Sequence, residues 1–279
     1  MSGSREQIEQ DLYPVERIAG EIVAFSGRDE AEVWRRLALE METSGYNVRD
    51  EAAKYGVTPH IFDDRMLEFY RSSDAFFYET LIESRDAFRR KKWRTIVEFL
   101  QRESDDPATT KVLMYGDSVG SDSIYLRRLG FDVYYHDFDS YCSRFAFWRF
   151  EQRGLEIKKF AADEAPFDVI VCLEVAEHVT EPQKLVAELS ELTTDSGYCI
   201  FSEAFAMVES NFPTHLQSNL ALVGTTEELF RSAGMHLAWA DPDQKPMIFS
   251  KDEAKKFPTD RPSLLRRIGY HVKNELRTS

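Results

Sequence analysis

The sequence contains no apolar run that approaches the roughly 20 residues needed to cross a bilayer. Its first thirty residues are acidic and hold no apolar core of the kind that a secretory signal requires. No low-complexity tract interrupts a chain of 279 residues, which is long enough to bury a full core. We therefore expect a cytoplasmic protein without a membrane partner, built as one large domain or as one domain with an appendage.

Cysteine is scarce, with three residues at Cys142, Cys172 and Cys199. Cys172 and Cys199 lie inside apolar, strand-like runs, where a reduced cysteine behaves as a small core residue. The spacing fits neither a disulfide framework nor a zinc site. The sequence therefore predicts no disulfide and no metal site.

Positive charge is also in short supply, because 35 Lys and Arg face 49 Asp and Glu, for a net charge of −14. Binding to nucleic acid needs a basic surface, so we expect no nucleic-acid partner. The one basic stretch is the tail at 251–279, which holds eight Lys/Arg and four Asp/Glu. Its run LLRRIGYHVKNELR predicts an amphipathic C-terminal helix that packs by its apolar face.

The pattern of apolar residues changes near the middle of the chain. Up to residue 104 the apolar residues recur at helical spacing, as in AEVWRRLALEMETSG, and SDDPATT then forms a polar linker. After it, short β-branched or aromatic runs alternate with helix-length segments, which predicts βαβ units and a mainly parallel sheet. The last two runs, GMHLAWAD and PMIFSK, are so close that they must pair as an antiparallel hairpin. The expected fold is α/β, with a doubly wound sheet preceded by a helical N-terminal region at 1–104.

The first strand of the second half ends in the loop GDSVG, with glycines at Gly116 and Gly120 and a serine at Ser118. Glycine lets a backbone approach a ligand closely, but such a loop is also compatible with an ordinary turn. Asp137 ends the next strand, where an acid can accept hydrogen bonds from a ribose diol. Asp139 is an alternative, although the cap of the following helix suits it as well. Together these residues favour a nucleotide-like ligand.

The run VLMYGDSVG…GFDVYYHDFD…FDVIVCLEVAEHVTEP resembles the class I S-adenosylmethionine (SAM) dependent methyltransferases, over about residues 111–250. The most specific part is FDVIVCLEVAEHVTEP, which is similar to the fourth strand of that family and the loop after it. The resemblance implies a Rossmann-like domain at 105–279 with seven strands, SAM as the cofactor, and residues 1–104 as a cap that shapes the substrate pocket.

The resemblance also implies residue roles. Gly116, Asp117, Ser118 and Gly120 would pass under the cofactor, and Asp137 would hold its ribose hydroxyls. Asp163 would lie near the adenine, with Glu174 and Val175 near the methionine portion.

Two positions depart from the family pattern. Family members usually have an acid at the position of Met114 and often a glycine at that of Ser118. The acid helps to hold the methionine amino group, so here either another group takes that contact, such as Asp117 or a residue of the N-terminal half, or the cofactor is held unusually.

Candidates for chemistry on the acceptor are two histidines and two tyrosines. His178 follows the fourth strand, where the alternative role is to anchor the loop, and His215 lies in the long segment ESNFPTHLQSN, where a surface position is the alternative. A histidine there can act as a base because its pKa lies near neutrality. Tyr70 and Tyr78 belong to an aromatic cluster in which most side chains should be core, and we expect one hydroxyl to reach the active site.

The function favoured by these residues is a SAM-dependent methyltransferase for a small molecule. One alternative is that SAM is itself the substrate and cyclises to azetidine-2-carboxylate plus methylthioadenosine. Another is a non-catalytic module that binds a partner through its helical half. A homodimer is possible on this sequence.

Overall fold

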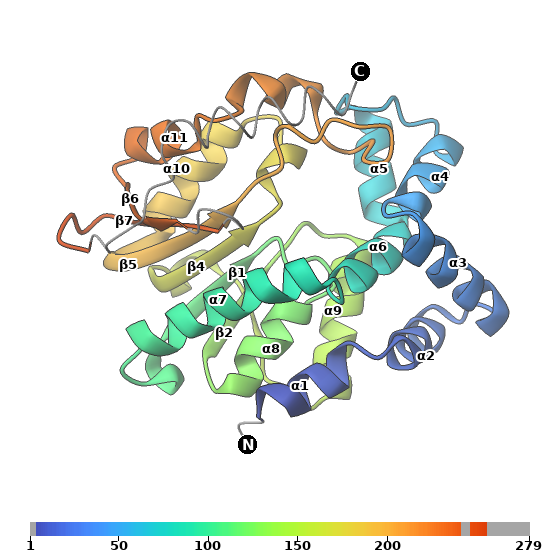
Figure 1. Ribbon diagram of the computed structural model, residues 1–279, viewed down its shortest axis with the longest axis horizontal. Helices are drawn as coiled ribbons and strands as arrows, with labels where there is room; N and C mark the ends of the chain where they lie inside the picture. The colour runs from blue at the N-terminus through green and yellow to red at the C-terminus, as the bar shows by residue number, and fades with distance from the viewer. Residues whose placement is uncertain (1–3, 241–245, 256–279) are drawn as a thin grey trace.

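The computed structural model describes residues 4–240 and 246–255. The N-terminal third is helical, as its sequence pattern predicts (Figure 1). Short loops join its helices, several of which begin at an aspartate or serine that accepts a hydrogen bond from the first turn. The helices are α1 (Arg5–Leu12), α2 (Val15–Ser26), α3 (Glu30–Glu42), α4 (Tyr46–Lys54), α5 (Asp64–Ser72), α6 (Ala75–Glu83) and α7 (Ala87–Glu103).

A seven-stranded sheet follows in the order β3-β2-β1-β4-β5-β7-β6. Its first five strands are parallel, and β7 is antiparallel to both neighbours, which confirms the predicted fold class and its terminal hairpin. The turn of that hairpin lies outside the described residues. The strands are β1 (Lys111–Tyr115), β2 (Asp132–His136), β3 (Lys158–Lys159), β4 (Phe167–Leu173), β5 (Thr193–Ser202), β6 (His236–Ala240) and β7 (Met247–Ser250).

The sheet is covered on both faces because its strands are apolar at successive positions. In β1, Val112 and Met114 join the core formed with α1, α7 and α8, whereas Leu113 joins the core under α10 and α11. The crossover helices are α8 (Ser121–Leu129), α9 (Tyr141–Gln152), α10 (Pro182–Leu192) and α11 (Thr226–Ser232), and short 3₁₀ turns are η1 (Pro107–Thr109), η2 (Ala162–Glu164), η3 (Ala176–His178) and η4 (Gln217–Leu222).

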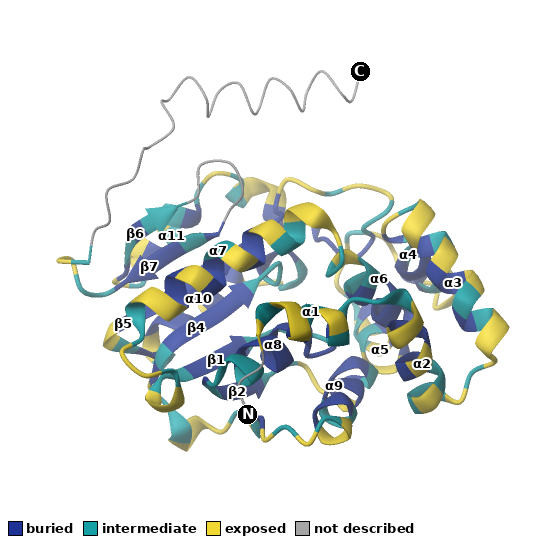
Figure 2. Cartoon of the chain, turned by 60° about the horizontal axis from the view of Figure 1, so that its bottom comes forward, coloured by how far each residue is buried: buried dark blue, intermediate teal, exposed yellow. Residues whose placement is uncertain are grey.

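The helical half divides differently from the expected boundary at residues 104 and 105. Apolar side chains of α1 and α7 belong to the core of the sheet, whereas α2 to α6 enclose a second core of their own. The segment that builds this second core begins after Tyr13 and ends before Arg85. These two residues lie side by side, because Arg85 Nε donates a hydrogen bond to the Tyr13 carbonyl oxygen at 2.7 Å. We call α2 to α6 the cap. It is an insertion between two helices of the sheet domain, and Figure 2 shows it as a separate lobe beside the sheet.

Helix α9 joins the cap to the sheet. Ala146 and Phe150 face the sheet core, and Phe145 faces the cap core, where its ring lies 4.4 Å from that of Phe77. The fully buried Arg149 donates from Nε to Glu21 of α2 at 2.8 Å and from Nη1 to the Val119 carbonyl oxygen at 2.6 Å. One guanidinium therefore ties the cap to the loop after β1.

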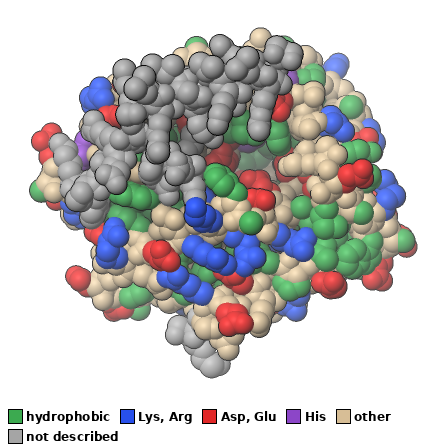
Figure 3. All heavy atoms as spheres, in the orientation of Figure 1, with side chains coloured by type: hydrophobic (Ala, Val, Ile, Leu, Met, Phe, Trp, Pro, Cys, Tyr) green, Lys and Arg blue, Asp and Glu red, His purple; other side chains and the backbone are tan. Residues whose placement is uncertain are grey.

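Lys and Arg side chains gather over α7 on the face shown in Figure 3. Their charge is largely compensated, since Arg90 and Arg94 both pair with Glu9, and Arg89 pairs with Asp122. No described helix is both long and apolar enough to span a membrane. The predicted C-terminal helix within 251–279 lies outside the described residues from position 256 onward.

Candidate functional site

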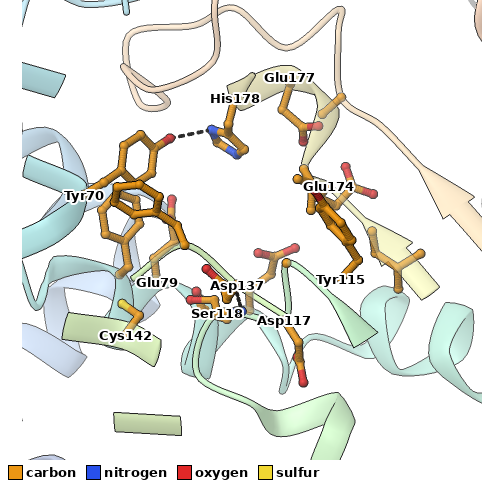
Figure 4. Close-up of a pocket in the computed structure, with 18 of the residues that line it drawn as sticks. Tyr70, Glu79, Tyr115, Asp117, Ser118, Asp137, Cys142, Glu174, Glu177 and His178 are labelled. Carbon is orange, nitrogen blue, oxygen red and sulfur yellow. Dashed lines mark hydrogen bonds between the residues drawn. The ribbon is translucent and has the colours of Figure 1, made fainter. Parts of the chain in front are cut away.

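A cavity of about 720 Å³ lies at the carboxyl ends of β1, β2 and β4. This is the edge of a doubly wound sheet at which ligands bind. The cap closes the cavity through α5 and α6, and the segment 204–216 after β5 closes it from the other side. Figure 4 shows polar side chains from the sheet loops and the cap pointing into this space.

The loop after β1 is shaped for close approach to a ligand. Gly116 has a φ of +77°, and a Cβ atom there would lie 2.4 Å from Cγ2 of Val175. Ser118 adopts a φ of +44°, unusual for a residue with a side chain, and is held by two hydrogen bonds. Its N–H donates to Asp137 Oδ2 at 2.6 Å, and its carbonyl oxygen accepts from the Tyr135 hydroxyl at 2.6 Å. This loop is a backbone cradle beside a carboxylate, which fits the expected cofactor.

Burial in the cavity raises the pKa of Asp137 to about 6, against the opposing effect of the N–H groups of Ser118 and Phe138. A carboxylate with a raised pKa in a cleft marks a candidate binding site, because donors of a ligand can replace the lost water. Asp137 is therefore placed to accept hydrogen bonds from a ligand diol.

Asp117 and Gly120 have mainly structural roles in the loop after β1. The Asp117 carboxylate accepts hydrogen bonds from the N–H and Oγ of Ser123 at 2.7 and 2.6 Å, so it caps the start of α8. Burial and the charge of Asp122 raise its pKa to about 7. Gly120 does not line the cavity, and a Cβ there would lie 2.5 Å from the ring of Phe150. The glycine at 120 is thus required by the packing of α9.

The end of β4 brings a charged pair to the cavity. Glu174, with a φ of +54°, accepts hydrogen bonds at Oε1 from Lys92 Nζ at 2.7 Å and from Ser202 Oγ at 2.6 Å. Met114 lines the cavity with only 2% of its surface exposed. The usual acid at the end of β1 is therefore replaced by an apolar side chain, with the Lys92–Glu174 pair nearby.

Acids of the cap face the same end of the cavity. Glu79 and Glu83 of α6 and Arg89 of α7 all line it. Burial raises the pKa of both carboxyls, and the charge of Arg89 partly offsets this at Glu83. Glu83 itself is exposed, and it borders the cavity.

Two histidines meet across the cavity wall, with ring centroids 4.8 Å apart. The Nδ1 atom of His178 lies 2.9 Å from the Tyr70 hydroxyl and 3.2 Å from the Thr214 carbonyl oxygen. The Nδ1 atom of His215 lies 2.8 Å from the Met207 carbonyl oxygen. A carbonyl oxygen only accepts, so the Met207 contact assigns the His215 proton to Nδ1 and leaves a lone pair on Nε2. The Thr214 contact favours the same tautomer of His178, in which the Tyr70 hydroxyl accepts a hydrogen bond from Nδ1. Burial, assisted by the neighbouring ring, lowers the pKa of His178 to about 3, and burial lowers that of His215.

Glu177 completes this group and was not singled out from the sequence as a chemical residue. It is 1% exposed, lines the cavity, and neither of its carboxylate oxygens has a partner at hydrogen-bonding geometry. Burial and the charge of Glu174 raise its pKa well above the usual value, although backbone N–H groups of Glu177 and Ala204 lie near enough to oppose the effect. Nothing in the sequence links it to His215, because 37 residues separate them and only the fold brings them together.

Other predicted site residues are scattered. Tyr70 lines the cavity and stacks on Phe76, with ring centroids 5.1 Å apart. Tyr78 does not line it, because its ring is buried in the cap under the guanidinium of Arg36, 4.0 Å away. Asp163 lies exposed on η2 and outside the cavity, where His136 and Phe138 occupy the nearest wall. Glu83 of the cap and Arg89 of α7 had no sequence signal, since only the fold brings them to the cavity.

The sheet order, with its reversed β7 and a cavity at the carboxyl ends of β1, β2 and β4, defines the class I fold of SAM-dependent methyltransferases. A family model described as "Methyltransferase domain" matches residues 85–257, more than half of the chain. The chain belongs to this family, which confirms the resemblance seen in the sequence and SAM as the cofactor. The match begins just before α7, in agreement with the packing of α7 on the sheet.

Solved structures of low identity resemble the chain. Magnesium protoporphyrin IX methyltransferase from Synechocystis PCC 6803 with bound SAM is 18% identical, with a TM-score of 0.45, covering 61% of this chain and 81% of that one. A putative sarcosine dimethylglycine methyltransferase from Galdieria sulphuraria is 13% identical, with a TM-score of 0.46, covering 71% and 78%. The [4+2]-cyclase SpnF is 16% identical, with a TM-score of 0.40, covering 55% and 61%. The search of curated proteins gave no match.

Proposed function

We propose that this protein is a methyltransferase that transfers the methyl group of SAM to a small molecule. The observation that carries the proposal is the cavity at the sheet edge, which has a glycine-containing loop beside Asp137 at one end and a histidine cluster at the other. Its volume, about 720 Å³, falls in the range of small-ligand sites. Cap residues line one side of the cavity and limit the room for an acceptor, which favours a small one.

The nucleoside end of the cofactor is held by the loop after β1 and by the end of β2. The Asp137 carboxylate accepts hydrogen bonds from the ribose diol, and Gly116 allows the backbone to approach because it has no side chain. When bound, SAM supplies a methyl group activated by its sulfonium. The protein's own part is to align the acceptor in line with that methyl group and to exclude water.

The methionine end is held by the cap in place of the missing acid at Met114. Its ammonium and carboxylate groups are complementary to a carboxylate near a guanidinium, and the cavity offers Glu83 with Arg89, whose Nη2 also pairs with Asp122. The Asp117 carboxylate is a poorer candidate because it already accepts two hydrogen bonds from Ser123. A contact from the N-terminal half of the chain thereby replaces the acid that is missing at Met114.

The acceptor lies beside Tyr70, His178 and His215, which line one end of the cavity. Apolar side chains of Phe76, Met207 and Phe212 line the same region and would bind a partly apolar molecule. His215 is the better candidate to activate an acceptor hydroxyl or amine through the lone pair on Nε2, because burial lowers the pKa of His178 to about 3 and leaves it a weak base.

Product analysis tests this function. The protein is incubated with SAM, with and without a panel of phenolic, carboxylic and amine acceptors, and the products are identified by mass spectrometry. S-adenosylhomocysteine formed only with an acceptor supports methyl transfer. Methylthioadenosine released without any acceptor would instead indicate cyclisation of SAM, and no binding of SAM or S-adenosylhomocysteine at millimolar concentration would contradict both.

A further inference from the structure

We propose that Glu177, His178 and His215 bind a divalent transition-metal ion at the acceptor end of the cavity. One ligand atom from each of the three side chains can be chosen so that all lie within 4.8 Å of one another. Two imidazoles with one carboxylate form a common ligand set for Zn²⁺, Fe²⁺ and related ions. The sequence predicted no metal site because its ligands come from a 3₁₀ turn and a distant loop.

The state of Glu177 points to a missing cation. A carboxylate that is 1% exposed and has no hydrogen-bonding partner for either oxygen is costly to bury. Lys92, whose ammonium lies at the end of β4, already binds Glu174 at 2.7 Å. A metal ion between Glu177 and the two rings would satisfy both the charge and the open lone pairs.

The histidines are oriented as metal ligands are. In metal sites the ligating histidine usually donates its other ring N–H to a carbonyl or carboxylate, which fixes the ring. Here the Nδ1 atoms of His178 and His215 face the carbonyl oxygens of Thr214 and Met207, at 3.2 and 2.8 Å. Their Nε2 atoms are left as the ligand atoms.

The backbone around the three residues is also fixed. The N–H of Leu216 donates to the Glu177 carbonyl oxygen at 2.9 Å, and the Asn219 amide donates to the carbonyl oxygens of Ala176, Glu177 and Val179. From the cap, His60 Nδ1 lies 2.9 Å from the His215 carbonyl oxygen. This network holds the 3₁₀ turn η3 and the His215 loop together without a metal, so the ligands are arranged in advance.

Three protein ligands leave coordination positions open for an oxygen or nitrogen of another molecule. The three side chains line the cavity, where the proposed acceptor lies. A bound ion there would occupy the histidine lone pairs and take over their activating role, because it would orient an acceptor oxygen and favour its ionised form. This role rests on the proposed function, whereas metal binding itself does not.

The test is a titration of metal-stripped protein with Co²⁺, followed by visible absorption, and with Zn²⁺, followed by calorimetry. We expect one equivalent to bind, with an affinity at least about 100-fold weaker in Glu177→Gln and in His215→Ala, which are tested separately. His236→Asn is the matched control, since His236 lies on β6 outside the cavity, and it should bind as the parent does.

Two results would overturn the proposal: no binding up to 1 mM metal, or equal affinity in the parent and both variants. Titration of the same samples with S-adenosylhomocysteine verifies that each variant keeps a folded cavity. It also separates the two proposals, because cofactor binding without metal binding contradicts only the metal site. Metal binding without cofactor binding contradicts only the proposed function.

Discussion

Asp137 is the residue on which cofactor binding should depend most directly. Replacing it with Asn keeps the shape but removes the charge, so the hydrogen bonds to the ribose lose about 1.5–3 kcal/mol. We expect Asp137→Asn to weaken the binding of S-adenosylhomocysteine by about tenfold or more in calorimetry. The control is Asp139→Asn, since Asp139 is exposed and outside the large cavity. Equal affinities of the parent and Asp137→Asn would show that the ribose is held elsewhere.

The raised pKa of Asp137 predicts a pH dependence of the same affinity. Folding raises the pKa of Asp137 from 3.8 to about 6, so the folded protein holds this proton more tightly than the unfolded chain does. The stability that this proton contributes is therefore present below pH 3.8 and is lost as the pH rises through about 6. Binding needs the ionised form, so affinity should fall about tenfold between pH 7 and pH 5. Asp137→Asn should lose this part of the slope, and any slope that remains belongs to other groups such as Asp117. An identical pH profile in both proteins would contradict the assignment.

Glu83 is the residue proposed for the methionine ammonium, and a truncated ligand can isolate its role. Methylthioadenosine keeps the ribose and adenine but lacks the amino-acid group. We expect Glu83→Gln to weaken S-adenosylhomocysteine binding by about tenfold while leaving methylthioadenosine binding unchanged. Asp137→Asn should weaken both ligands. If Glu83→Gln weakened both ligands equally, Glu83 would have a structural role in the cap rather than a contact with the ammonium.

At the scale of single elements, Arg149 of α9 links structures that the sequence alone did not connect. It is fully buried and bonded both to Glu21 of the cap and to the loop after β1. Glu21 keeps ion pairs with Arg17 and Arg153, but the Val119 carbonyl oxygen loses a charged donor, which costs about 1.5–3 kcal/mol. We expect Arg149→Leu to lower the free energy of unfolding by that amount in denaturant titrations. Arg144→Leu, at an exposed position of the same helix, should change it by less than about 0.5 kcal/mol. A similar small effect at both positions would contradict the linking role of Arg149.

The strands could be predicted from sequence because apolar runs and turn residues are local signals. The loop after β1 and the acid at the end of β2 were also found, since their positions follow from the order of the elements. The sequence did not show why a glycine is needed at each position of this loop. Gly116 faces the cavity, whereas Gly120 makes room for Phe150. Tyr78 shows the same limit, because an aromatic cluster gives no sign of which ring faces a cavity and which packs on Arg36.

At the scale of the whole molecule, the sequence placed the boundary between the two halves at a polar linker, yet packing divides the chain elsewhere. The cap is inserted between Tyr13 and Arg85, and α1 and α7 on either side of it belong to the sheet. Helical periodicity shows that α7 has an apolar face but not which core that face joins. The prediction from sequence missed Glu177 as a member of the histidine cluster for a similar reason. Glu177 and His215 meet only after the loop 204–216 folds over the sheet edge.

A ligand in the cavity should stabilise both lobes, because its walls come from the cap and from the sheet. We therefore expect S-adenosylhomocysteine to slow amide hydrogen exchange in α5 and α6 as well as in the loops after β1, β2 and β4. The pair β6 and β7 lies at the far edge of the sheet and serves as the internal control, with less change. The effect in α6 should shrink in Glu83→Gln, whereas the loop after β1 stays protected. Protection confined to the sheet loops would mean that the cap does not contact the cofactor. Glu83 would then not replace the acid that is missing at Met114.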